Sequence, residues 1–159
     1  MDVWSLVTRY GWVLFIAVSV GNAFTIRCKT EANIGLNPAL AGGYERLFRR
    51  YLAVTNIPWV AMGLICMTGR VPTILSFFQP KEGNPYVLAW FALVMALWAY
   101  EIYWIFFNGG ADALVNHPGA YRLSFSRPWQ VKLLWIACIS WYCRDSRHVE
   151  LGWNFQVGA

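Results

Sequence analysis

Charged side chains are scarce in this chain of 159 residues. They make up 13% of the sequence, against roughly 25% in ordinary soluble domains, while 58% of the residues are hydrophobic. A soluble protein of this size would leave large apolar patches exposed. The formal net charge is +5, but no basic tract could follow a phosphate backbone, so we expect no nucleic-acid partner.

The residue types that most often build catalytic and metal sites are few and scattered. The two histidines, His117 and His148, lie in a turn and in a polar tail, outside every apolar run. The cysteines form no CxxC pair and lie at Cys28, Cys66, Cys138 and Cys143. No Ser or Cys nucleophile has a base nearby, and no cluster has metal-ligand spacing. We therefore predict no metal site and no catalytic residues, and favour a non-enzymatic protein over a membrane enzyme or redox partner that would hold a lipid-soluble substrate on an aromatic face.

Long apolar runs are what the sequence has in abundance. The clearest is YVLAWFALVMALWAYEIYWIFF, residues 86–107, which as a helix would rise about 33 Å and so cross a hydrocarbon core of about 30 Å. We predict four transmembrane helices at about residues 5–26, 51–69, 86–107 and 129–143. The predicted fold is therefore all-α: a polytopic membrane protein in which residues 1–159 form a single helical bundle with short interfacial helices.

Three shorter segments lie on the connections between these runs. Residues 44–50, YERLFRR, predict either an interfacial helix or an extension of the second span. Residues 71–79, VPTILSFFQ, are mostly apolar but too few to cross, so we expect an interfacial or re-entrant piece. Residues 111–117, ADALVNH, follow a Gly-Gly pair and stop at a proline, which predicts a short surface helix.

Positive charge is distributed unevenly between the two sides of this bundle. The loop between the first two runs and the loop between the last two hold more arginine and lysine than the opposite side does. Short cytoplasmic loops are rich in these residues, so we place both loops in the cytoplasm and both termini outside, in a bacterial inner membrane. Three arginines of the segment 44–50 are expected to contact lipid headgroups, namely Arg46, Arg49 and Arg50.

Glu101 is the one charged residue within the run 86–107, and an acid at that depth needs a partner or a function. It can be a structural acid, protonated or paired with a neighbouring span. The candidate partners for that role are Arg9, Lys132, Asn22, Asn56 and a tryptophan indole. It can instead contact another subunit, or serve as an ion or proton site. The sequence leaves all three interpretations open.

The same run has two distinct faces. Small residues recur at spacings of three, four and three, and so form one stripe of Ala89, Ala92, Ala96 and Ala99. At 100° per residue, Glu101 lies about 160° from the centre of that stripe. The face of Glu101 also carries Trp90, Trp98 and Trp104. We expect the alanines to pack against a partner helix, and the aromatic face to contact a partner or a lipid-soluble ligand such as a quinone or pigment.

A second polar insertion, TNIP, interrupts the run 51–69. Pro58 removes a backbone donor, and Thr55 and Asn56 can bond to the groups that it frees. The insertion predicts either a simple kink or a polar pocket at the break. In the first run, Asn22 is interpreted in the same way, as an interhelical hydrogen bond or part of a polar site.

These features favour a structural, accessory or assembly subunit of a larger membrane complex. The expected partners are the lipid bilayer, other membrane subunits and copies of the chain itself. The alternative is a homo-oligomeric ion or proton channel, or a small transporter, that uses Glu101 and the polar break at Asn56. We expect bound lipid and no required cofactor.

Overall fold

The computed structural model describes residues 3–80, 83–120 and 125–153, and over these ranges the chain is helical, without strands. The elements follow one another as α1 (Val3–Leu36), η1 (Pro38–Leu40), α2 (Ala41–Met67), η2 (Ile74–Phe78), α3 (Pro85–Phe107), α4 (Gly110–Asn116) and α5 (Pro128–Trp153). The two η elements are short 3₁₀-helices. The all-α class predicted from the sequence is confirmed over the described part of the chain.

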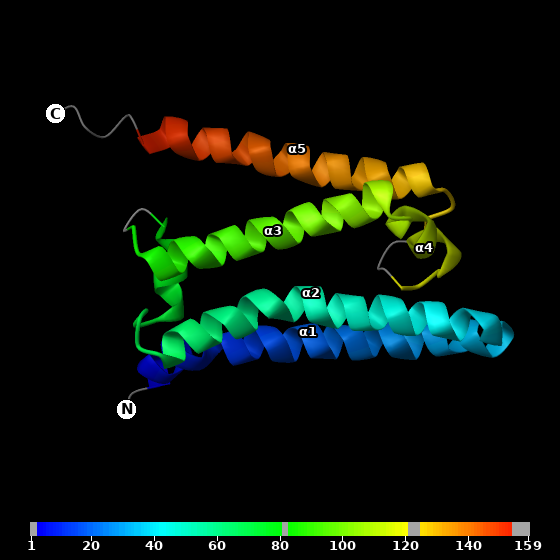
Figure 1. Ribbon diagram of the computed structural model, residues 1–159, viewed down its shortest axis with the longest axis horizontal. Coiled ribbons are helices and arrows are strands. Elements are labelled where there is room, and N and C mark those ends of the chain that lie inside the picture. Colours follow the sequence, from blue (N-terminus) through cyan, green and yellow to red (C-terminus); the bar gives the residue numbers. More distant parts are fainter. Residues whose placement is uncertain (1–2, 81–82, 121–124, 154–159) are drawn as a thin grey trace.

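The long helices lie roughly parallel to one axis (Figure 1). α1 and α2 form an antiparallel hairpin, and α3 packs against α2. α5 starts where α3 and α4 meet and runs back toward the end at which α1 begins. We call that end, where η2 also lies, the η2 end, and the end that holds α4 the α4 end.

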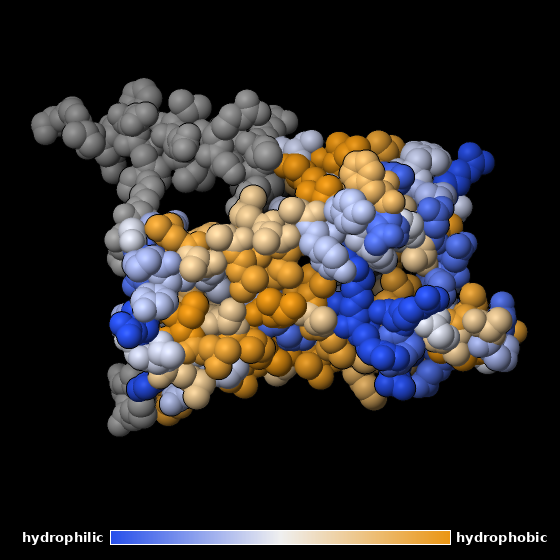
Figure 2. All heavy atoms as spheres, viewed as in Figure 1, coloured by the Kyte–Doolittle hydropathy of each residue, from blue (hydrophilic) through white to orange (hydrophobic). Residues whose placement is uncertain are grey.

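Three helices are long and apolar enough to cross a membrane, spanning Leu6–Leu36, Pro38–Met67 and Pro85–Phe107. Much of their apolar surface is exposed, including Leu14, Val18, Phe24, Leu64 and Met95. Figure 2 shows a hydrophobic belt across the middle of the molecule, with hydrophilic side chains gathered around the α4 end and again at the opposite end. A lipid core between two polar interfaces accommodates this distribution. The chain is thus compatible with a small membrane protein.

The four predicted spans are not confirmed. The fourth span, predicted at 129–143, lies within the helix α5 but is not among the helices that meet the length and hydropathy required for crossing. Its apolar stretch is only about three quarters of the roughly 20 residues that a crossing needs. It also contains Lys132 and is followed directly by Arg144 and Asp145. The side chains from residue 141 onward lie outside the described ones.

The other helix boundaries show where local signals were informative. α3 and α4 begin and end within one residue of the predicted limits. α1 was expected to end near residue 26, but it continues to Leu36, because the polar stretch that follows contains no proline until Pro38. α2 begins at Ala41, so residues 44–50 extend the second span and do not form a separate helix.

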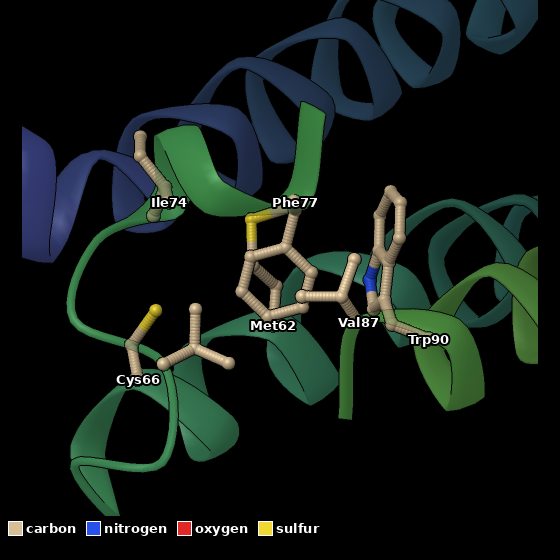
Figure 3. Close-up of a cluster of buried hydrophobic side chains, with 7 residues drawn as sticks. Met62, Cys66, Ile74, Phe77, Val87 and Trp90 are labelled. Carbon is tan, nitrogen blue, oxygen red and sulfur yellow. The ribbon is translucent and has the colours of Figure 1, made fainter. Parts of the chain in front are cut away.

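The larger core cluster joins η2 to α2 and α3 (Figure 3) and consists of Met62, Cys66, Val71, Ile74, Phe77, Val87 and Trp90. Phe77 is fully buried, and its ring meets that of Trp90 edge-on with centroids 5.4 Å apart. The indole Nε1 of Trp90 donates to the carbonyl of Pro58 at 2.8 Å. The segment predicted to be interfacial or re-entrant is therefore packed into the bundle through its apolar side chains.

Two glycines let tryptophans lie directly on a neighbouring backbone. A Cβ added to Gly63 of α2 would stand 2.5 Å from the indole of Trp12 in α1. A Cβ on Gly110 of α4 would stand 2.6 Å from the indole of Trp104 in α3. These contacts fix α1 on α2 and α4 on α3. A smaller core cluster of Ile105, Ala111 and Val131 then joins α3, α4 and α5 at the α4 end.

Candidate functional site

Glu101 of α3 is paired with Arg50 of α2. Arg50 Nη2 donates to Glu101 Oε1 at 2.9 Å, and each side chain is 18% exposed. The sequence alone indicates contact of Arg50 with lipid headgroups and does not identify it as a partner for the acid. A second span that starts at residue 51, as the sequence predicts, leaves Arg50 outside the bundle, so the pair is not apparent from the sequence. The available signal was a positive residue about two and a half turns inside the start of a longer α2.

Aromatic side chains of α3 hold the guanidinium in place. Arg50 Nη1 donates to the Tyr100 hydroxyl at 2.9 Å. The Cζ atom of Arg50 lies 3.9 Å from the centroid of the Trp104 ring and 4.5 Å from that of Tyr100. A desolvated guanidinium over such rings gains cation–π attraction on top of its ion pair. Arg50 Nε is buried and has no hydrogen-bond partner among the described residues, so the site does not satisfy all of its donors.

The two charges lie at a matching depth on their helices. At a rise of 1.5 Å per residue, Glu101 is about 24 Å from Pro85, and Arg50 is about 25 Å from Met67. A hydrocarbon core of about 30 Å that began at the η2 end would contain the pair just inside its far boundary. A neutral pair at that depth costs less to bury than either charge alone.

Two hollows adjoin the pair, and Trp104 lines both of them. The inner hollow, of about 220 Å³, contains Glu101 and Thr55 but is otherwise lined mainly by apolar and aromatic side chains, including Tyr51, Val54, Ile105, Leu114 and Trp135. The outer hollow, of about 330 Å³, has a more polar lining that includes Arg46, Asn108, Gly109 and His117. Leu47, Arg50 and Trp104 line both hollows. The ion pair therefore stands where an apolar space meets a polar one.

A third hollow, of about 390 Å³, lies between α1 and α2 at the α4 end of the molecule. Its lining is largely apolar and includes Ile26, Ile34 and Phe48, with Arg27 over the Phe48 ring at 5.5 Å. It shares Leu47, Tyr51 and Ala120 with the inner hollow.

The turn that contains His117 is clamped onto the α1–α2 hairpin. The Tyr44 hydroxyl and the Asn33 amide both donate to the Pro118 carbonyl, at 2.7 and 2.9 Å. The His117 ring contacts Gly43 so closely that a Cβ on this glycine would overlap it. Its Nδ1 is 2.7 Å from the Ala113 carbonyl. His117 thus packs α4 against α2 and presents its ring at the edge of the outer hollow.

The polar residues proposed as companions of Glu101 lie elsewhere. Ser19 of α1 donates to Asn56 Oδ1 at 2.8 Å, and Asn56 Nδ2 donates to the Leu52 carbonyl at 2.8 Å. Asn56 therefore bonds toward α1, and it lines neither hollow beside the ion pair. Asn22 of α1 is partly buried. The hydrogen bonds of Asn56 are thus made with Ser19 and Leu52 and not with Glu101.

The two faces predicted for α3 are separated in the structure. All four alanines of the stripe, Ala89, Ala92, Ala96 and Ala99, are exposed, so no described helix of this chain covers them. Their packing against a partner helix stays a prediction. On the opposite face, Trp90 is buried in the core and Trp104 stacks on Arg50, whereas Trp98 is 41% exposed. The three tryptophans therefore do not form one continuous surface.

The three arginines assigned to headgroups also have different surroundings. Arg49 Nε bonds to Glu45 Oε1 at 3.1 Å on the exposed side of α2. Arg46 is exposed and lines the outer hollow, and Arg50 turns inward to Glu101.

Comparisons of the chain with protein family models, with curated proteins and with solved structures found no match. Among the described residues, no group of three or more His, Cys, Asp or Glu side chains is placed to hold a metal ion. The function of the chain is therefore inferred from the geometry of the Arg50–Glu101 ion pair, the hollows and the exposed faces.

Proposed function

We propose that this chain is a non-catalytic subunit of a larger membrane assembly, and that it binds a transmembrane helix of another subunit through the alanine stripe of α3. One observation carries the proposal: the prominent polar residues of the spans are paired within the chain, whereas its small-residue stripe is left uncovered.

The paired polar residues serve the chain's own packing. Glu101 bonds to Arg50 between α3 and α2, and Asn56 bonds to Ser19 between α2 and α1. Inside a bilayer such contacts join helices, because lipid offers no competing hydrogen bonds. An ion path would need some of these groups to face a shared polar space, yet the two pairs lie on different sides of α2.

The alanine stripe is suited to close helix contact. Lipid supplies no hydrophobic force between helices, so their association depends on close packing, which small residues allow. Ala92 and Ala96 lie one turn apart near the middle of α3, and both are exposed. The bulkier Leu88 and Met95 flank the stripe and are exposed as well. A partner helix lying on the alanines would also contact these two side chains.

Site-specific photo-cross-linking in native membranes tests this proposal. A photoreactive side chain at Ala92 is expected to form one discrete adduct, and Ala96→Leu is expected to abolish it by keeping the helices apart. Ala53, which is exposed on α2, gives the matched control: a photoreactive side chain there should form no discrete adduct, and Ala53→Leu should leave the Ala92 adduct intact. Mass spectrometry of the adduct identifies another subunit, as proposed, or a second copy of this chain. A diffuse pattern unaffected by Ala96→Leu would refute the proposal.

The alternative of a channel or transporter is favoured by one observation, the presence of Glu101 and Thr55 on the wall of the inner hollow. Flux assays on purified protein in lipid vesicles separate the two functions. The subunit proposal expects no proton or cation flux above that of empty vesicles. Flux that Glu101→Gln alters and Glu45→Gln leaves unchanged would replace it with the alternative.

A further inference from the structure

We propose that the outer hollow binds the phosphate group of an anionic lipid, whose acyl chain enters the inner hollow. This site is formed by α2, α3 and α4 and lies on the face of α3 opposite the alanine stripe. It is independent of the proposed contact with another subunit.

The outer hollow has an excess of positive charge. Arg46 and Arg50 lie one helical turn apart on α2, and both line this hollow. Glu101 balances Arg50, whereas Arg46 makes no ion pair among the described residues. Asn108 and His117 add polar groups to the same wall. Arginine binds phosphate oxygens through charge-assisted hydrogen bonds, and basic pockets between membrane helices bind anionic headgroups.

Arg49 provides an internal contrast. It carries the same charge and lies between Arg46 and Arg50 in the sequence, but it points to the outer surface, where it pairs with Glu45 and its side chain is 73% exposed. It does not line the outer hollow. General attraction to a negatively charged bilayer would involve Arg46 and Arg49 alike, whereas a built phosphate site depends on Arg46.

The depth of the hollow matches the depth of lipid phosphates. At 1.5 Å per residue, Arg46 is about 31 Å from Met67 along α2, close to the thickness of a hydrocarbon core of about 30 Å. Arg46 would therefore lie at the boundary where headgroups begin if that core starts at the η2 end. The inner hollow, which adjoins Glu101, would lie just inside the core.

The two hollows together match an amphiphile. They share Leu47, Arg50 and Trp104, so a molecule in one hollow touches the same side chains as a molecule in the other. The outer hollow offers positive charge, and the inner hollow offers apolar groups such as Val54 and Ile105. Glu101 would repel a phosphate from the inner hollow and so fixes the orientation with the headgroup outward. A free phosphate ion would use the outer hollow alone.

The test uses the full-length chain purified in mild detergent, with retained lipid measured by native mass spectrometry after incubation with vesicles of phosphatidylglycerol or of phosphatidylcholine. We expect retention of phosphatidylglycerol in preference to the zwitterionic lipid. Arg46→Gln should lower this retention about fivefold, the effect expected for one basic residue at a charged lipid surface. Arg49→Gln, the matched control, should change it less than twofold.

Two further measurements identify the source of the phosphate. Val54→Phe, which narrows the inner hollow, should reduce lipid retention without affecting the binding of inorganic phosphate at millimolar concentration. Phosphate binding that depends on Arg46, with no lipid retained, would reassign the site to a soluble phosphate. Equal retention by the Arg46→Gln and Arg49→Gln variants, or equal retention of both lipids, would overturn the proposal. Arg46→Gln should leave cross-linking from Ala92 unchanged, so this proposal and the subunit proposal can fail separately.

Discussion

Arg50 and Glu101 are bonded at 2.9 Å across the α2–α3 interface, with the guanidinium lying on the ring of Trp104. This contact joins the two helices near the α4 end, while the apolar cluster around Phe77 joins them at the η2 end. The interface is therefore held by an apolar cluster at one end and by an ion pair at the other. The inner and outer hollows lie beside the ion pair, where the side chains do not fill the space between the helices.

The ion pair predicts that the stability losses caused by substituting Arg50 and Glu101 are not additive. Glu101→Gln or Arg50→Gln alone leaves one charge without its counterpart, which costs about 3–5 kcal/mol for fully buried pairs. Because both side chains here are 18% exposed, we expect a loss of about 1–3 kcal/mol for each single variant. The double variant should lose less than the sum of the two. Reversible unfolding in mixed detergent micelles measures all three, and strictly additive losses would mean that the pair is not coupled.

The close contact between Gly43 and His117 predicts that alanine is destabilising at position 43 but not at position 42. Gly43→Ala places a methyl group where the imidazole now lies, so α4 must move away from α2, and the variant should be less stable by about 1–3 kcal/mol. Gly42→Ala is the control, since nothing lies within 4 Å of its Cβ position. That variant should be equally stable or slightly more stable than the parent, because alanine favours the helix.

A compensating change distinguishes the steric cause from a general loss of helix. Adding His117→Ala to Gly43→Ala opens the space and should recover part of the stability lost in the single Gly43 variant. The melting temperature in detergent, followed by circular dichroism, reports all of these changes. If Gly42→Ala and Gly43→Ala proved equally damaging, the close contact would not be the reason.

Much of the fold follows from sequence patterns that act locally. Asn84 and Pro85 start α3, and Asn84 accepts a hydrogen bond from the Tyr86 amide at 3.0 Å, so the start of this helix could be located from the sequence. The start of α2 could not. Its first two turns are too polar for a span, and its N-cap residue, Leu40, makes no side-chain capping bond that would mark the start. The Asn37 cap belongs to the preceding 3₁₀ turn.

The candidate site was less predictable, because its residues come from distant parts of the chain. The need of Glu101 for a partner follows from the cost of a buried charge, but which of the available cations reaches it depends on the register of α2 against α3. The position of His117 on Gly43 likewise depends on how α4 folds back. Hollows are what packing leaves unfilled, so no sequence pattern encodes them directly.

The hydrogen bond between Ser19 and Asn56 predicts a modest structural role for Asn56, and not a role in an ion path. Asn56→Ala removes the contacts with Ser19 and with the Leu52 carbonyl, and should lower stability by about 0.6 kcal/mol and by no more than about 1.7, the average and the maximum for hydrogen bonds between membrane helices. Ser19→Ala should cost less, because Asn56 keeps its bond to the backbone. Steric trapping in bicelles gives both values. A vesicle flux that appears in the parent chain and vanishes only in Asn56→Ala would contradict this role.

The arrangement of the helices also predicts which segments share a side of the membrane. Gly35 near the end of α1 and Asp112 in α4 lie toward the α4 end, whereas Gln79 follows η2 at the opposite end (Figure 1). In a chain whose native cysteines are replaced, Gly35→Cys and Asp112→Cys should react with a membrane-impermeant maleimide from one side, and Gln79→Cys from the other. Because arginine and lysine are more numerous in the loops on that side, we predict that the first two positions react from the cytoplasmic side.

The same labelling experiment decides whether α5 crosses the membrane. α5 runs back from the α4 end toward the end at which α1 begins (Figure 1), so we expect a tag fused after residue 159 to be accessible from the side of Gln79. Exposure of the tag on the side of Gly35 would instead mean that α5 lies along the interface and that the chain has three spans. Gly35→Cys serves as the internal control in every sample, since its accessibility is set by the α1–α2 connection and does not depend on α5. The number of spans matters for function, because an α5 that left the bundle would expose to a partner the side of α3 and α4 around Ile105 and Ala111, on which Val131 of α5 now packs.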